Sequence, residues 1–130
     1  MNYGLGKLDD YKIHCFNGIP KIIQVDFDRF SNHRRNLYDT NWNYIEAEIC
    51  YPTDKSHMIE RPQALDEMLN IAEKLSKGCS YVRVDLYWTG NQVLFGELTF
   101  HHGSGCEIIK PESFSYLLGN WIKLPKTTKN

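Results

Sequence analysis

The sequence lacks the features that mark several common classes of protein. No apolar run approaches the roughly 20 residues of a membrane-spanning helix, and the opening segment MNYGLGKLDD has no hydrophobic stretch of the kind found in signal peptides. The four cysteines stand far apart without a C-x-x-C pair, which argues against a zinc knuckle or a dense disulfide framework. We therefore expect a cytoplasmic protein without membrane insertion, in which Cys15, Cys50, Cys79 and Cys106 are reduced thiols.

The charge balance excludes a further group of functions. The chain has 15 basic and 16 acidic residues and a formal net charge of −1, so no strong field attracts nucleic acid or an anionic membrane. We find no internal repeat and no low-complexity segment. A chain of 130 residues can bury one hydrophobic core, and we expect a single domain over 1–130 with flexible ends at 1–8 and 125–130.

Two β-hairpins and a helix account for most of the predicted secondary structure. In the first hairpin, YKIHCF and IPKIIQVDF flank Asn17-Gly18, and Asn-Gly between apolar runs is a strong hairpin signal. Residues 28–43 are polar and without periodicity, which indicates a loop. The segment YIEAEICYP that follows is consistent with a short strand ended by Pro52.

The segment 62–77 has the apolar spacing of one helix face. Pro62 suits a first helical turn, and Gly78 suits the position after the last one. A shorter helix is expected after Pro111. We therefore predict an α+β fold, with a mainly antiparallel sheet of two β-hairpins and one long helix packed on one face.

The second hairpin, YVRVDLYW and VLFGELTF, carries the most informative pattern. Its apolar residues fall at even positions, which are Val82, Val84, Leu86, Trp88, Leu94, Leu98 and Phe100. Opposed residues in an antiparallel pair have a constant sum of numbers, and only an even sum places these residues on one face. A three-residue turn at 90–92 gives the sum 182, which opposes Asp85 to Glu97 and Arg83 to Thr99 on the other face.

Two opposed carboxylates repel each other unless a cation lies between them. A divalent metal fits this need, because Mg²⁺ binds one or two carboxylates and fills its other positions with water and phosphate. Arg83 could then bind a phosphate or carboxylate with its planar guanidinium. The alternative is a solvated outer face on which Arg83 neutralises both acids.

The order of motifs resembles a known family. R-x-D on one strand and E-x-T on the next, followed by a glycine-containing loop, resembles the metal-binding hairpin at the end of the ATP-grasp fold, as in D-alanine:D-alanine ligases. The match extends to DDYKIHCFNGIPKIIQVDFDRFSNHRRNLYD, the helix, VRVDLY and GELTFHHGSG. Over residues 7–124 the chain is similar to the TupA-like ATP-grasp family found among bacterial surface-polysaccharide genes.

The resemblance implies a role for individual residues. Asp85 and Glu97 would bind Mg²⁺ bridging the phosphates of ATP, and Thr99 stands where many members have a metal-binding asparagine. Arg83 would contact the γ-phosphate or an acyl-phosphate intermediate. Lys12 would act with Arg29 or Arg34 on phosphates or on a substrate carboxylate.

The resemblance covers only the C-terminal lobe of an ATP-grasp fold. It implies a truncated or split carboxylate-amine ligase of polysaccharide biosynthesis, which uses Mg²⁺, ATP and a carboxylate substrate and forms a homodimer or binds a separate chain that supplies the missing lobe. A non-catalytic, dimerising remnant of the fold is one alternative. A glycosyltransferase of a surface-polysaccharide pathway is another.

Overall fold

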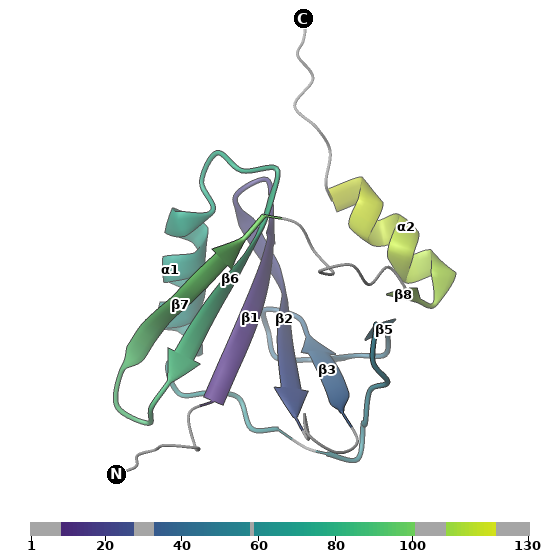
Figure 1. Cartoon of the computed structure of the whole chain (residues 1–130), viewed down its shortest axis with the longest axis horizontal. Helices are drawn as coiled ribbons and strands as arrows, with labels where there is room; N and C mark the ends of the chain where they lie inside the picture. The colour runs from purple at the N-terminus through teal and green to yellow at the C-terminus, as the bar shows by residue number, and fades with distance from the viewer. Residues whose placement is uncertain (1–8, 28–32, 58, 101–108, 122–130) are drawn as a thin grey trace, which may run out of the picture.

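The computed structural model describes residues 9–27, 33–57, 59–100 and 109–121, and it is an α+β structure (Figure 1). Its main element is a six-stranded antiparallel sheet in the order β4-β3-β2-β1-β6-β7. These strands are β1 (Asp9–Phe16), β2 (Ile19–Phe27), β3 (Arg34–Tyr38), β4 (Tyr44–Ile45), β6 (Tyr81–Trp88) and β7 (Val93–Thr99). A two-stranded sheet of β5 (Glu48–Ile49) and β8 (Ile109–Lys110) and the helices α1 (Leu65–Leu75) and α2 (Glu112–Trp121) complete it.

The first hairpin forms as the sequence predicts. Asn17 and Gly18 have φ values of 55° and 80°, the positive angles that a two-residue hairpin turn with native twist requires. The outer edge of β1 then pairs with β6, so that Lys12 lies opposite Asp85 and His14 opposite Arg83. The β1–β6 ladder therefore joins the two hairpins into one sheet.

The second hairpin has the expected register at Arg83 and Asp85, but the loop that connects its strands is longer than expected. Asp85 lies opposite Glu97 and Arg83 opposite Thr99, as predicted. The connection is not a three-residue turn, because β6 ends at Trp88 and β7 begins at Val93. A register shift after Asp85 compensates for the fourth loop residue and leaves Gly96 as the extra residue of a β-bulge.

Because of the bulge, the core positions of β7 differ from those expected from the sequence. Leu98 still packs against the core beneath α1. Leu94 now lies opposite Tyr87, and Phe95 takes the place opposite Leu86. Leu94 and Phe100, both expected in the core, are among the exposed large hydrophobic residues.

Two other sequence expectations need correction. Residues 28–43 were expected to form a loop, yet they contain β3, which carries the sheet beyond β2. The long helix expected over 62–77 is shorter: α1 has 11 residues and α2 has 10, so a single long helix is not confirmed. Residues 62–64 form a turn instead, in which Leu65 donates a backbone hydrogen bond to Pro62.

Each face of the sheet buries its own hydrophobic cluster. Beneath α1, residues such as Ile13, Val84 and Met68 are fully buried. On the opposite face, α2 and β5 cover only one end of the sheet, with Phe114 and Leu118 packed near Ile22. Figure 1 shows α1 behind the sheet and α2 to one side of it, beside β8. The second face is therefore left for polar side chains over β1, β6 and β7.

The state of the cysteines also differs from the expectation of reduced thiols. Cys50 is disulfide-bonded, whereas Cys15 and Cys79 are free, and Cys106 lies outside the described residues. The expectation is therefore wrong at Cys50.

Within the part of the chain that the structure describes, no helix combines the length and the apolar character needed to cross a bilayer.

Candidate functional site

A pocket of about 320 Å³ opens on the polar face of the sheet, at the strands that carry the predicted site. Its lining comes from β1, β6 and β7 and consists of Asp10, Lys12, Arg83, Asp85, Tyr87, Gly96 and Glu97. The pairing of Lys12 with Asp85 and of Asp85 with Glu97 places these side chains in one row across three strands. The structure thus brings together four of the residues singled out from the sequence.

Arg83 and Asp85, which both line this pocket, form a bidentate ion pair. Arg83 Nε donates to Asp85 Oδ1 at 2.8 Å and Nη2 donates to Oδ2 at 2.9 Å, the geometry that a guanidinium offers a carboxylate. Nη2 also lies 3.4 Å from Thr99 Oγ1 and 3.8 Å from Glu97 Oε2. One guanidinium therefore contacts all three residues predicted to bind metal.

The ion pair does not fully compensate the charge of Asp85. Burial raises the pKa of Asp85 although the Arg83 guanidinium opposes this. Burial likewise works to lower the pKa of Arg83, but hydrogen bonding and attraction from Asp85 raise it above the ordinary value. Arg83 is thus firmly charged, while Asp85 lies where additional positive charge would be favourable.

Lys12 belongs to a second ion-pair group at the edge of the pocket. Its Nζ lies 2.5 Å from Asp10 Oδ2 and 3.8 Å from Asp26 Oδ2. Asp26 accepts hydrogen bonds from Arg35 Nε at 2.6 Å and Nη2 at 3.5 Å, and His33 Nε2 lies 3.7 Å away. Burial acts to raise the pKa of Asp26, but Arg35, Lys12 and His33 together lower it. Lys12 is therefore held between two carboxylates.

A buried chain of hydrogen bonds fixes the side chains behind Lys12. Gln24 Nε2 donates to the Asp26 carboxylate at 3.3 Å, and Gln24 Oε1 lies 2.7 Å from His14 Nε2. Because an amide oxygen only accepts, His14 Nε2 is the donor. The Tyr81 hydroxyl lies 2.7 Å from His14 Nδ1, and burial raises the pKa of this phenol, so it is protonated.

The two arginines proposed for the loop are placed differently. Arg29 lies outside the described residues. Arg34 lies on β3 beside Arg35, and adjacent strand residues point to opposite faces. Arg35 shares the face of its partner Asp26, while Arg34 Nη1 donates to the carbonyl of His33 and does not line the pocket.

Sequence reasoning missed Asp10, Asp26 and the His14 network. Asp10, Lys12 and His14 alternate along β1, and this alternation was a usable signal. It could not be connected with Asp85, because the β1–β6 pairing joins segments some 70 residues apart and leaves no local pattern in the sequence.

The donor set suits a hard cation with few protein ligands. Among the described residues, no group of three or more His, Cys, Asp and Glu side chains is arranged to hold a metal ion. Asp85 and Glu97 remain as an opposed carboxylate pair beside the pocket. Mg²⁺ binds in this way, because it takes one or two carboxylates and completes its shell with water and phosphate oxygens.

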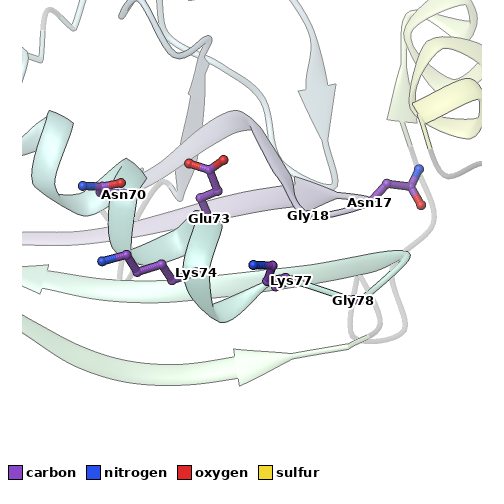
Figure 2. A pocket seen from close by; sticks show the side chains of 7 residues that line it. All are labelled: Asn17, Gly18, Asn70, Glu73, Lys74, Lys77 and Gly78. Carbon is purple, nitrogen blue, oxygen red and sulfur yellow. The ribbon is translucent and has the colours of Figure 1, made fainter.

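A second hollow, of about 480 Å³, lies between the turn of the first hairpin and the end of α1 (Figure 2). It is lined by Asn17, Gly18, Asn70, Glu73, Lys74, Lys77 and Gly78. Its charged side chains are exposed and of mixed sign, and it contains none of the residues singled out from the sequence. The pocket on the polar face is therefore the candidate site.

Comparison with known proteins identifies the family of the chain. The model of the TupA-like ATPgrasp family matches residues 4–123. The chain belongs to the TupA-like ATPgrasp family. ATP-grasp proteins generally bind ATP and Mg²⁺, which accords with a pocket that combines carboxylates with cationic side chains. No curated protein and no solved structure matches the chain significantly.

Proposed function

We propose that this TupA-like ATPgrasp chain supplies the Mg²⁺- and phosphate-binding half-site of a carboxylate-amine ligase in surface-polysaccharide synthesis. The observation that carries the proposal is the single pocket in which Lys12, Arg83, Asp85 and Glu97 meet, in a chain whose family is defined by the ATP-grasp fold. In such a reaction a substrate carboxylate attacks the γ-phosphorus of ATP, ADP departs, and an amine then displaces phosphate from the acyl phosphate.

The charges of the pocket and its neighbours favour a metal-bound nucleotide. The ion-pair groups described above contain Lys12, Arg35 and Arg83 against Asp10, Asp26, Asp85 and Glu97. With more carboxylates than cations, this face favours a nucleotide that is bound together with a divalent cation over free ATP. A bound Mg²⁺ would neutralise phosphate charge as it develops.

The residues of the chain have distinct roles in this proposal. Asp85 and Glu97 hold the cation, and Thr99 contributes its hydroxyl oxygen. Arg83 and Lys12 contact phosphate oxygens of ATP or of the acyl phosphate. Arg29 and Arg34 stay predictions as contacts to phosphate or to the substrate carboxylate.

The proposed reaction also has consequences for the partner and the compartment. A second lobe completes an ATP-grasp site, supplied by a separate chain or by a second copy. Use of ATP favours the cytoplasm, whereas a disulfide is uncommon in a reducing compartment. Thiol labelling of protein isolated without reductant distinguishes a reducing from an oxidising compartment, because Cys50 reacts with the label only if its disulfide is reduced.

The test is a calorimetric titration of the chain with ATP, with and without Mg²⁺. We expect heat that depends on Mg²⁺, and we expect the Asp85→Asn, Glu97→Gln double variant to weaken binding more than about tenfold, since even outer-shell partners of a metal are worth that much. The matched control is Asp66→Asn, Glu67→Gln, which removes the same two charges from the exposed face of α1. Mg²⁺-independent binding, or equal affinity in both double variants, contradicts the proposal.

One observation favours a second candidate function, a module that associates through its sheet edge. β7 is the last strand of the six-stranded sheet, and Leu94, Phe95 and Phe100 on and beside it are exposed. An unpaired strand edge with apolar side chains is a template for pairing with another chain. A dimer formed through the β7 edge would use the fold of the chain and would not require ligase activity.

A further inference from the structure

The position of Arg83 Nη2 bears on how the metal and the nucleotide bind. Arg83 Nη2 lies 2.9 Å from Asp85 Oδ2, 3.4 Å from Thr99 Oγ1 and 3.8 Å from Glu97 Oε2. These oxygens belong to the three residues assigned to the metal in the proposed function. A positively charged nitrogen of this chain therefore converges on the oxygens that a cation would use.

A guanidinium and a divalent cation compete for these oxygens. Mg²⁺ binds oxygen at about 2.0–2.1 Å and demands nearly octahedral geometry, which restricts the N–H groups that can be directed at the same carboxylate oxygens. The two positive charges would also repel each other at short range. Binding of one therefore weakens binding of the other.

We infer that Arg83 is an internal counter-ion that competes with the divalent cation for Asp85, Glu97 and Thr99, and that nucleotide phosphate relieves the competition by taking the released guanidinium. This inference rests on the proposed function for the location of the metal. It concerns a regulation of that site, namely that the metal binds poorly without nucleotide.

The surroundings of Arg83 permit this exchange. The side chain borders the 320 Å³ pocket, and 13% of it is exposed, so the guanidinium can turn toward a ligand without breaking the hydrophobic core. Its planar fork matches two phosphate oxygens as well as it matches the Asp85 carboxylate. The phosphate therefore replaces one bidentate partner with another.

Thermodynamic linkage gives the inference a measurable form. If metal binding releases Arg83 and phosphate captures it, each ligand raises the affinity of the protein for the other by the same factor. The cooperativity should depend on the positive charge at position 83. Removing that charge should strengthen binding of the metal alone and reduce its coupling to ATP.

The experiment is a titration of the chain with Mn²⁺ in the absence of nucleotide, in which electron paramagnetic resonance measures free Mn²⁺. We expect Arg83→Gln to bind Mn²⁺ at least about tenfold more tightly than the wild type, the effect of removing one competing charge at contact distance. With ATP present, the factor by which the nucleotide improves Mn²⁺ affinity should fall by a similar amount.

Arg35→Gln is the matched control. Arg35 is also largely buried and paired with an aspartate on the same face, but it does not line the pocket. Its loss changes the net charge equally and should alter Mn²⁺ affinity by less than about threefold, because the charge is farther from the metal ligands. Adding Asp85→Asn to Arg83→Gln should abolish the gain in affinity.

Loss of Arg83 leaves Asp85 buried without its partner, so circular dichroism must first confirm folding. Arg83→Lys provides a second variant, which keeps the charge but reaches fewer oxygens and should bind Mn²⁺ with intermediate affinity. A folded Arg83→Gln or Arg83→Lys protein that binds Mn²⁺ no better than the wild type overturns the inference. Failure of the wild type to bind Mg²⁺-ATP overturns the proposed function instead, and leaves the gain in nucleotide-free Mn²⁺ binding as a separate result.

Discussion

Asp26 lies among four polar side chains, Arg35, Lys12, His33 and Gln24, and only 4% of its own side chain is exposed. Burial acts to raise its pKa, but Arg35 and the other cations lower it below the ordinary value of 3.8. A carboxylate with a lowered folded pKa stabilises the protein above its unfolded pKa, and this stabilisation is lost as the pH falls through the folded pKa. Asp26 therefore ties the stability of the fold to pH.

We expect Asp26→Asn to reduce the free energy of unfolding at pH 7 by about 3 kcal/mol, because it leaves Arg35 buried without its charged partner. The difference from the wild type should shrink as the pH falls below 3.8, where the wild-type carboxylate also becomes protonated. Urea unfolding of both proteins at several pH values measures this difference.

Asp66→Asn is the control for this change. Asp66 also pairs with an arginine, but its side chain is 89% exposed, so its loss should cost less than about 0.5 kcal/mol. An Asp26→Asn protein that is as stable as the wild type at pH 7 would show that the ion-pair group around Asp26 contributes nothing to the fold.

The β7 bulge sets the position of Glu97 relative to Asp85, and Gly96 makes the bulge possible. A Cβ atom at position 96 would lie 2.8 Å from Tyr87 Cε2 and 2.9 Å from the carbonyl oxygen of Asp85. The ring could move, but the carbonyl belongs to the backbone of β6. We therefore expect Gly96→Ala to destabilise the protein by about 1–3 kcal/mol through overpacking and to displace Glu97 from the pocket.

Chemical unfolding measures the stability of Gly96→Ala, and amide chemical shifts of β6 and β7 report the displacement. Asn91→Ala is the control, because Asn91 is exposed in the turn of the same hairpin. Unchanged shifts around Glu97 in a fully stable Gly96→Ala protein would contradict the importance of the bulge.

This hairpin also shows how far sequence reasoning reaches. Hydrophobic alternation opposes Asp85 to Glu97 because a register with the wrong parity would expose one apolar face, and the structure has this pairing. Alternation cannot reveal a bulge, because an extra loop residue and an extra strand residue compensate each other. The prediction was therefore right at Asp85 and wrong at Leu94 for the same reason.

Other parts of the structure depend on contacts that no local pattern records. β3 carries the charged and polar residues RRN in its first half, and pairing with β2 and β4 together with burial of Asn36 makes it a strand. Asn36 satisfies its amide within the fold, since it accepts hydrogen bonds from Thr53 and Asp54. From the sequence alone such a residue is assigned to a loop, because its hydrogen-bond partners belong to distant segments.

Among the residues that the structure describes, one edge of the sheet has no further strand beside it. α1 packs on β1, β2 and β6, and β7 forms the outer edge of the sheet (Figure 1). Phe95 lies opposite Leu86, whose side chain is buried beneath α1, yet Phe95 is 58% exposed. β7 itself carries one charged residue, Glu97, and has no proline or lysine of the kind that protects strand edges.

We therefore expect the chain to associate through β7, with a second copy as the simplest partner. Phe95→Lys places a protecting charge on this edge and removes apolar contact area, so it should weaken association at least about tenfold.

Leu117→Lys is the matched control, because Leu117 is an exposed leucine on α2, away from β7. Sedimentation velocity over a range of concentrations measures both. Equal sedimentation of the two variants and the wild type as monomers would assign the exposed edge to a different chain, and mixing experiments with a candidate second lobe would then show whether Phe95→Lys also blocks assembly of the ATP site.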